Sequence, residues 1–337
     1  MSDNQIVSKY LQHQDLTWDL RRIAEEIITE TGFVLDGGEA QRRTIYDPNK
    51  VWRIRLTGSY QGHLAVLRIE NLKLERDEEL IREAFRRQAK DTRVRPPKTY
   101  LTHPFDEKKG YAFSIDERVE GEVLFDPTGS PQEAVKKFSV FYRCLRLAVK
   151  EPFWPNAQGE AKVFSEKQAA TWRKVAQEKN PESLQKVWPF AEHLREAMLS
   201  RLTDHPLRFQ HAHLAGSDVR VLPDGSWVVF ANHLWSWRQP GYDVIFPLWH
   251  QWMSLPIDRR TPKAVEDITE TWMRMISGDL GDLVDIRDVR PMLFNRLYGS
   301  LLLDISAKIH RQGETPESVQ KLEEIFHTEA ERLMGDG

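Results

Sequence analysis

A single cysteine, Cys144, occurs in the 337 residues, so the chain cannot form an internal disulfide. Its neighbours on a predicted helix are apolar, which favours a buried, inert thiol over a nucleophile. The N-terminus is polar and lacks the basic start and apolar run of a secretion signal. The missing disulfide and the missing signal together predict a cytoplasmic protein.

Long apolar runs and a strong excess of one charge are missing as well. No segment approaches the roughly 18 consecutive apolar residues that a membrane span requires, so no membrane partner is expected. The net charge of -3 gives no field that would gather nucleic acid. The composition is that of an ordinary globular protein, with 40% hydrophobic and 29% charged residues. The length suits two domains or one two-lobed unit.

The first 115 residues change periodicity several times. Apolar residues at helical spacing predict an amphipathic helix over 15–31, which Gly32 ends. Alternation then predicts three strands, at about 40–46, 51–56 and 64–69. Helical spacing returns over 76–90, and two more strands are expected at 98–101 and 111–115. The predicted order after the first helix is three strands, a helix and two strands.

Beyond residue 122 the pattern is mostly helical. A capping box of Ser130 and Glu133 opens the first helix of this part, and Thr315-Pro316 opens the last. Helices are expected at 130–150, 165–178, 182–202, 241–254, 262–277, 288–311 and 315–334.

The stretch from Phe209 to Asp243 carries the most chemistry. A strand end delivers His211-Ala212-His213, Asp218 follows, and a hairpin with a Pro-Asp-Gly turn returns to Asn232. This layout resembles the catalytic and metal-binding segments of the aminoglycoside phosphotransferase and choline kinase branch of the protein-kinase-like fold. The family pattern is His-Gly-Asp, four residues, Asn, then a hairpin that ends in a second Asp. In this chain the residue types at those positions are exchanged.

The resemblance implies an α+β protein with a two-lobed kinase-like fold, in which a small antiparallel-sheet N-lobe with one helix precedes a large helical C-lobe. It divides the chain into an N-terminal helical segment (1–32), the N-lobe (33–115), the hinge (116–122) and the C-lobe (123–337), with the catalytic-like segment at 209–243. ATP and Mg²⁺ are the cofactors that it implies for any activity.

The family's catalytic aspartate falls on His213, which can accept a proton near neutral pH. Its two metal ligands fall on Asp218 and Asn232, with carboxylate and amide swapped, so oxygen ligands of the kind that Mg²⁺ prefers are kept. Asp218 is also expected to act in catalysis. A one-residue shift would place Ala231 at the second metal position and leave it without a ligand, and this alternative stays open at the level of sequence.

The nucleotide-binding residues that the resemblance implies lie in the N-lobe and the hinge. Arg68 stands where the family has a strand lysine, with Glu83, or Glu79 one turn earlier, as its partner on the helix. Arginine is not a conservative replacement where a point charge is needed, and a purely structural ion pair is the alternative. Backbone groups of the hinge are expected to meet adenine around Asp116, Glu117 and Val119.

The loop expected to cover the phosphates, residues 46–50, contains no glycine. Glycine lets backbone amides approach phosphates closely, whereas Pro48 offers no amide and Asp47 repels anions. Gly58 and Gly62 are interpreted as residues of the following turn. This loop argues against ordinary ATP use.

Other polar and aromatic residues of the segment have plainer explanations. Zinc binding by His211, His213 and His233 with Asp218 is a weak prediction, and His211 is expected to be structural. Asp243 is expected to cap a helix. The tryptophans between 227 and 252 are expected mostly to pack in the core or between helices.

Two functions fit these residues. The first is a pseudokinase that uses ATP weakly or not at all and acts by binding a small-molecule or protein ligand. The second is an atypical ATP- and Mg²⁺-dependent small-molecule kinase in which His213 is the base, Asp218 and Asn232 hold the metal, and Arg68 neutralises phosphate. The glycine-free loop favours the first.

Overall fold

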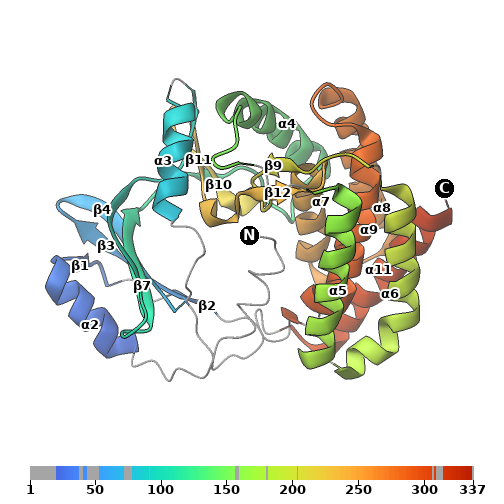
Figure 1. Ribbon diagram of the computed structural model, residues 1–337, viewed down its shortest axis with the longest axis horizontal. Coiled ribbons are helices and arrows are strands. Elements are labelled where there is room, and N and C mark those ends of the chain that lie inside the picture. The colour runs from blue at the N-terminus through green and yellow to red at the C-terminus, as the bar shows by residue number, and fades with distance from the viewer. Residues whose placement is uncertain are drawn as a thin grey trace.

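The computed structural model describes residues 20–37, 41–43, 53–71, 78–90, 92–155, 159–179, 181–202, 204–305, 307–308 and 314–335. A sheet-rich lobe from the N-terminal part stands beside a helical lobe from the rest (Figure 1). The predicted two-lobed α+β fold is therefore confirmed. In the described ranges, no helix is long and apolar enough to cross a membrane.

An antiparallel sheet forms the first lobe. Its strands lie in the order β1 (Val34–Leu35), β3 (Arg53–Tyr60), β4 (His63–Glu70), β7 (Tyr111–Glu117) and β6 (Thr99–Asp106), and β2 (Gln41–Arg43) also pairs with β3. The helix α3 (Glu78–Gln88) follows β4 in the chain. The predicted strands and helix of this lobe are all present, each within a few residues of the expected place.

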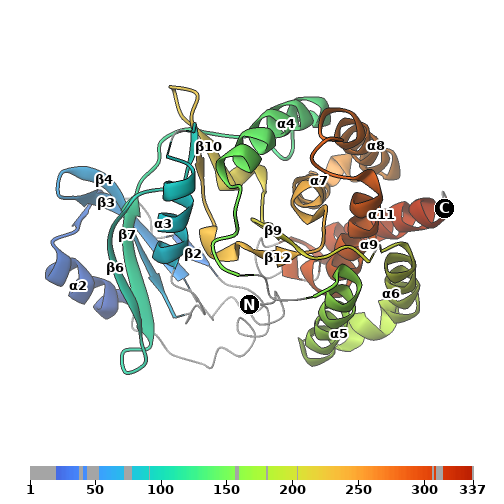
Figure 2. The ribbon, with the colours of Figure 1, turned by 45° about the horizontal axis from the view of Figure 1, so that its top comes forward.

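The sheet has two different faces because side chains alternate along each strand. Leu67, Ile69 and Ile115 are fully buried and pack with Ile23 and Ile27 of the helix α2 (Leu20–Thr31). Between them, Arg68, Ser114 and Asp116 face α3. Figure 2 shows α2 and α3 on opposite sides of the sheet. The apolar face is thus covered by α2, and the polar face looks toward α3 and the second lobe.

Gly58 lies within β3 rather than in a turn. A Cβ atom there would lie 2.0 Å from the carbonyl oxygen of Val34 and 2.8 Å from the ring of Phe33. Only glycine lets β1 cross this closely, so the interpretation of Gly58 as a turn residue is wrong. Gly62 does lie in the β3–β4 turn, where Gln61 and Gly62 both have positive φ, as a tight hairpin requires.

Helices make up most of the second lobe. They are α4 (Pro131–Ala148), α5 (Ala161–Lys179), α6 (Pro181–Arg201), α7 (Tyr242–Ser254), α8 (Pro262–Asp279), α9 (Ile286–Gly299) and α11 (Pro316–Gly335). Ser130 caps α4 as predicted, because its side chain accepts the amide of Glu133.

One predicted helix, 288–311, is not a continuous α-helix. α9 ends at Gly299, and the wider π-helical turn η4 (Ser300–Asp304) continues the chain. A Cβ at Gly299 would lie 2.8 Å from the ring of Trp172, and the hydroxyl of Ser300 accepts the indole N–H of Trp249 at 2.6 Å. π-helical turns are often found at functional sites.

Two small sheets hold the segment 209–243. One has the order β5 (Val94–Arg95), β11 (Trp227–Val229), β10 (Val219–Val221) and β8 (Glu122–Val123). The other pairs β9 (Arg208–Gln210) with β12 (Ser236–Arg238). β5 comes from the range expected to form the N-lobe, yet it pairs in parallel with β11. The chain therefore joins the two lobes through β5, before it reaches the expected hinge at 116–122.

Candidate functional site

Asp243 anchors the start of the catalytic-like segment. Its buried carboxylate accepts the backbone amides of His211, at 3.1 Å, and Ala212, at 2.6 Å. Burial raises its pKa to about 6. The residue that caps α7 is Gly241, so the prediction that Asp243 is the helix cap is wrong; the carboxylate instead fixes the strand end that carries His213.

Two alanines next to this anchor have left-handed backbone conformations, Ala212 with φ 65° and Ala231 with φ 56°. The segments that hold them are joined by Phe230, whose amide donates to the carbonyl of Asp218 and whose carbonyl accepts from Nε2 of His211, each at 2.8 Å. A left-handed conformation costs an L-residue about 1–2 kcal/mol, and such strain gathers at functional sites. His211 is structural, as expected, and burial lowers its pKa to about 4.

His213 and Asp218 form a hydrogen-bonded pair. Nδ1 of His213 lies 2.8 Å from Oδ2 of Asp218, which also accepts the amide of Ala215 at 3.0 Å. Burial favours a raised pKa for Asp218, but the His213 ring and its hydrogen bond outweigh burial and lower the pKa. The ionised carboxylate can only accept, so Nδ1 carries a proton, and in a neutral imidazole Nε2 is then the nitrogen with the lone pair. The pair has the arrangement of a base held by an orienting carboxylate.

The side chain of Asn232 already has hydrogen-bond partners within the protein. The residue is fully buried, its side-chain nitrogen donates to the carbonyl of Val229 at 2.8 Å, and its oxygen accepts the indole N–H of Trp235 at 3.2 Å. Both ends of the Asn232 amide thus have partners within the protein, and Ala231 beside it carries no side-chain ligand atom. Within the described ranges, no three His, Cys, Asp or Glu residues are grouped as metal ligands would be, and this includes His211, His213 and His233 with Asp218.

An aromatic side chain of α7 packs against the His213 ring. The ring of Phe246, on α7, lies 4.4 Å from the His213 ring, and the guanidinium of Arg296 lies 3.8 Å from the ring of Trp249. The sequence analysis did not single out His250, although its spacing of four residues from Phe246 places both on one face of α7. Burial lowers the pKa of His250 to about 4, and Asp218 opposes that shift.

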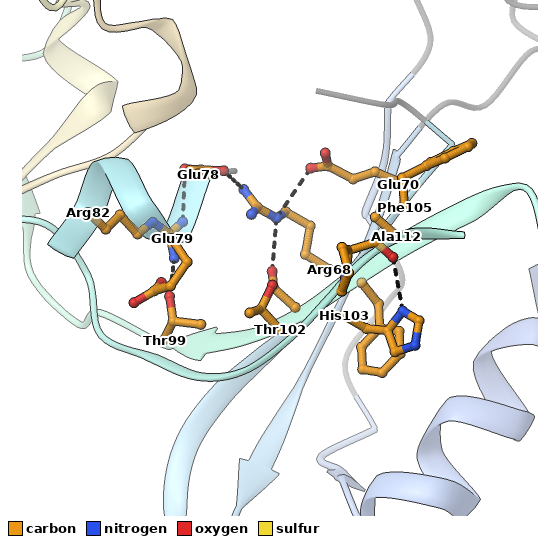
Figure 3. Close-up of a pocket in the computed structure, with 13 residues that line it drawn as sticks. Arg68, Glu70, Glu78, Glu79, Arg82, Thr99, Thr102, His103, Phe105 and Ala112 are labelled. Carbon is orange, nitrogen blue, oxygen red and sulfur yellow. Dashed lines mark hydrogen bonds and ion pairs between the residues drawn. The ribbon is translucent and has the colours of Figure 1, made fainter. Parts of the chain in front are cut away.

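Arg68 lies between two carboxylates on the α3 face of the sheet (Figure 3). Its Nη1 is 2.8 Å from Glu78 and its Nε is 3.2 Å from Glu70. The prediction that Glu83 is its partner is wrong, because Glu83 is exposed, and Glu79 pairs with Arg86. α3 begins at Glu78, so this first residue, rather than one in the next turn, reaches the strand.

The ion pair belongs to a larger buried cluster. Arg82 contacts both Glu78, at 3.0 Å, and Asp116, at 2.6 Å. Asp116 also accepts hydrogen bonds from Ser114 and Thr99. With the pair of Arg53 and Glu70, three arginines face three carboxylates. Burial disfavours a charged Arg68, but Glu78, Glu70 and Asp116 together raise its pKa above the ordinary value.

The residues expected to form the hinge also have partners within the protein. The carboxylate of Asp116 lies in the charge cluster, and that of Glu117 pairs with Arg95 at 2.6 Å. The amide of Glu117 donates to the carbonyl of Lys98, and the amide of Arg118 to the carbonyl of Leu64. Val119, which follows, is partly exposed. The glycine-free loop 46–50 lies outside the described residues.

Comparison by sequence finds no relative, since no family model and no curated protein matches the chain. Solved structures match over nearly the whole length. A thermostable mutant of aminoglycoside phosphotransferase APH(4)-Ia, in apo form, is 12% identical with a TM-score of 0.57, and the match covers 93% of this chain and 98% of that one. Choline kinase LicA from Streptococcus pneumoniae is 14% identical with a TM-score of 0.55, over 94% and 99% of the two chains.

A microcompartment-associated aminopropanol kinase gives a similar match, with 14% identity, a TM-score of 0.55, and 94% and 98% of the two chains covered. Identities this low establish the fold and leave activity to be argued from the site. The chain has the two-lobed protein-kinase-like fold of aminoglycoside phosphotransferases and choline kinases, as the resemblance of its segment 209–243 predicted.

Proposed function

We propose that the protein is a pseudokinase: it binds a small-molecule or protein ligand and uses ATP weakly or not at all. Structures of the same fold include complexes with ADP and hygromycin B, with AMP-PNP and hygromycin B, and with ADP and spectinomycin. A nucleotide and a polar small molecule are therefore the first ligands to test. Phosphoryl transfer depends on a cation at the phosphates and on metal ligands, and both roles are weakened in this chain.

The burial and the hydrogen bonds of Asn232 are the main support for the proposal. A metal ligand needs an oxygen that a cation can reach, whereas the amide of Asn232 is fully buried and already accepts the indole N–H of Trp235. If the second metal position is Ala231 instead, it has no ligand atom at all. Asp218 is then the remaining carboxylate, and one of its oxygens accepts both His213 and Ala215.

The positions of Arg68 and the hinge support the same conclusion. Arg68 would have to leave Glu78 and Glu70 to neutralise a phosphate, which would remove one of the two arginines that each of these buried carboxylates contacts. In the hinge, the amides of Glu117 and Arg118 already have acceptors in the sheet, so backbone binding of adenine falls to Val119.

The test is a calorimetric and thermal-shift comparison of ATP, ADP and adenosine, each with and without Mg²⁺. We expect adenosine to compete with ATP and removal of the γ-phosphate to change affinity little. A ligand at 100 times its Kd stabilises the folded state by about 2.7 kcal/mol, so even weak binding is measurable. A Mg²⁺-dependent preference for ATP above about a hundredfold, or about 2.7 kcal/mol, would contradict the proposal.

A second function, an atypical ATP- and Mg²⁺-dependent small-molecule kinase, is favoured by the pair of His213 and Asp218. The Nε2 lone pair of His213 could accept the proton of a substrate hydroxyl while Asp218 holds the imidazole ring in place. The discriminating assay is a single-turnover reaction with labelled ATP and a panel of amino alcohols. Labelled product in the wild type that His213→Gln abolishes, with unchanged thermal stability, would select this function over the first.

A further inference from the structure

Residues 84–105 carry a strong excess of positive charge. They include six arginines and lysines and one acidic residue, Asp91, in a chain whose net charge is -3. Two of the six, Arg86 and Arg95, already pair with carboxylates of the protein. The other four side chains are exposed: Arg87, Lys90, Arg93 and Lys98.

Three of these cations gather at the end of α3, which lies at the top of the sheet-rich lobe (Figure 1). Arg87 is in the last turn of the helix, Lys90 follows it, and Arg93 precedes β5. The side chain of Gln88 bonds to the backbone of residues 150 and 151 at 2.8–3.1 Å, which brings the exposed Lys150 to the same place. We call Arg87, Lys90, Arg93 and Lys150 the basic patch.

Helix stability alone does not explain the basic patch. A cation near the end of a helix is stabilised by the helix dipole, which accounts for Arg87 and Lys90. Arg93 and Lys150 lie outside α3, so the dipole gives no reason for their presence. In the ranges that the structure describes, no carboxylate forms an ion pair with any member of the patch. Like charges that gather without carboxylates favour an anionic partner.

Leu80 indicates which kind of anionic partner fits. Single-stranded nucleic acids are held by cations together with aromatic side chains on which the bases stack. The one aromatic residue of α3, Phe85, is fully buried, whereas Leu80 is 64% exposed. Leu80 precedes Arg87 by seven residues, so both lie on one face of the helix. An exposed apolar side chain beside several cations suits a peptide with an apolar residue followed by carboxylates.

We propose that Leu80 and the basic patch form a docking surface for an acidic segment of a partner protein. An apolar residue of the partner packs on Leu80, and the carboxylates that follow it meet the basic patch. Glu83 is exposed on the same face, between Leu80 and Arg87, and therefore opposes binding. The surface lies outside segment 209–243, so the proposal does not depend on whether the protein uses ATP.

The probe is a fluorescent peptide of one leucine followed by glutamates, titrated with the full chain at low salt and followed by anisotropy. We expect Arg87→Gln with Arg93→Gln to weaken binding about fivefold, because an exposed charge pair contributes modestly. The matched control, Lys162→Gln with Lys167→Gln, removes the same charge from exposed sites on α5 and should leave the affinity unchanged.

Two further variants test the arrangement on α3. Glu83→Gln should tighten binding about twofold, because it removes the opposing charge. Leu80→Ala should weaken the peptide that carries leucine and leave a peptide of glutamates alone unaffected. Added salt should weaken every one of these complexes, since exposed charges are screened.

Three results would overturn the proposal. Equal weakening by the two double variants would mean that the peptide senses only net charge. Equal binding of a peptide with lysine in place of glutamate would exclude charge recognition. Binding of oligouridylate as tight as that of the acidic peptide would make the surface one for nucleic acid. All the substitutions are at exposed sites, and unchanged thermal unfolding of each variant confirms that binding alone is compared.

Discussion

At the scale of single residues, the neighbours Asn232 and Ala231 differ in whether an aspartate can replace them. Asn232 is fully buried against the carbonyl of Val229, whereas Ala231 is partly exposed and has a left-handed backbone that Asp adopts more readily than most residues. Exchange of the two predicted ligands, Asp218→Asn with Asn232→Asp, would set a carboxylate against a carbonyl oxygen. That repulsion, and not the order of the ligands, decides the outcome.

We predict that the exchange of Asp218 and Asn232 lowers the free energy of unfolding by about 1–3 kcal/mol and creates no Mg²⁺ site. The triple change His213→Asp, Asp218→Asn and Ala231→Asp should instead give Mg²⁺ binding by calorimetry with near wild-type urea stability. Tight Mg²⁺ binding by the first variant, or none by the second, would contradict this assignment of the metal position.

The left-handed alanine gives a second prediction at this scale. Ala231→Gly removes a Cβ penalty of about 1–2 kcal/mol and adds chain entropy to the unfolded state worth about 0.5–1 kcal/mol, so it should raise the free energy of unfolding by up to about 1.5 kcal/mol. Ala215 has φ -76° and serves as the matched control, for which glycine should be destabilising. Urea denaturation of both variants measures the difference; equal losses would mean that Ala231 is unstrained.

At the scale of helices and strands, α2 is an integral part of the first lobe. Ile27 is 1% exposed and lies in the cluster that covers the sheet, whereas Ile28 is only partly buried. We expect Ile27→Ala to lower the free energy of unfolding by about 2–5 kcal/mol and Ile28→Ala by distinctly less. Equal small losses for the two variants would show that α2 does not pack on the sheet in solution.

Periodicity was enough to predict the longer helices and strands, because their apolar spacing directly reflects which face is buried. It could not predict the break at Gly299, where the close approach of Trp172 and the bond from Trp249 come from distant parts of the chain. Nor could it place β5 beside β11, since a two-residue strand carries no periodic signal.

The segment that holds the candidate site was identified for a different reason. The order of His213, Asp218 and Asn232 along the chain identified the segment, but their partners depend on tertiary contacts. Which glutamate meets Arg68 depends on where α3 begins, and Glu78 is its first residue. The role of Asp243 likewise depends on a strand end about thirty residues away in sequence, which no local pattern reveals.

At the scale of the whole molecule, stability should fall as the pH falls below 7. Burial lowers the pKa of His211 and His250 to about 4, while an unfolded histidine titrates near 6.5. Between these values the unfolded chain binds protons that the folded chain does not, so acid favours unfolding. Asp243 acts in the opposite sense between about 6 and 4, because burial raises its pKa to about 6 and the folded state then holds the extra proton.

We therefore predict a loss of stability that begins as the pH falls below 7 and continues to pH 5, with Asp243 offsetting part of it below about pH 6. Urea denaturation at pH 7.5, 6.25 and 5 measures the slope. His250→Gln should flatten it, whereas His193→Gln, at an exposed site, should not. An unchanged slope in His250→Gln would show that His250 is protonated in the folded protein.

The buried charge cluster between α3 and the sheet also gives the two lobes different responses to heat. Hydration of ions becomes less favourable as temperature rises, so the penalty for burying Arg68, Glu78 and their neighbours shrinks on warming. The second lobe rests mainly on apolar packing, whose stabilisation per unit of buried area levels off at high temperature. Warming should thus stabilise the charge cluster of the small lobe relative to the apolar core of the large lobe. Cooling should weaken the packing of α3 on the sheet.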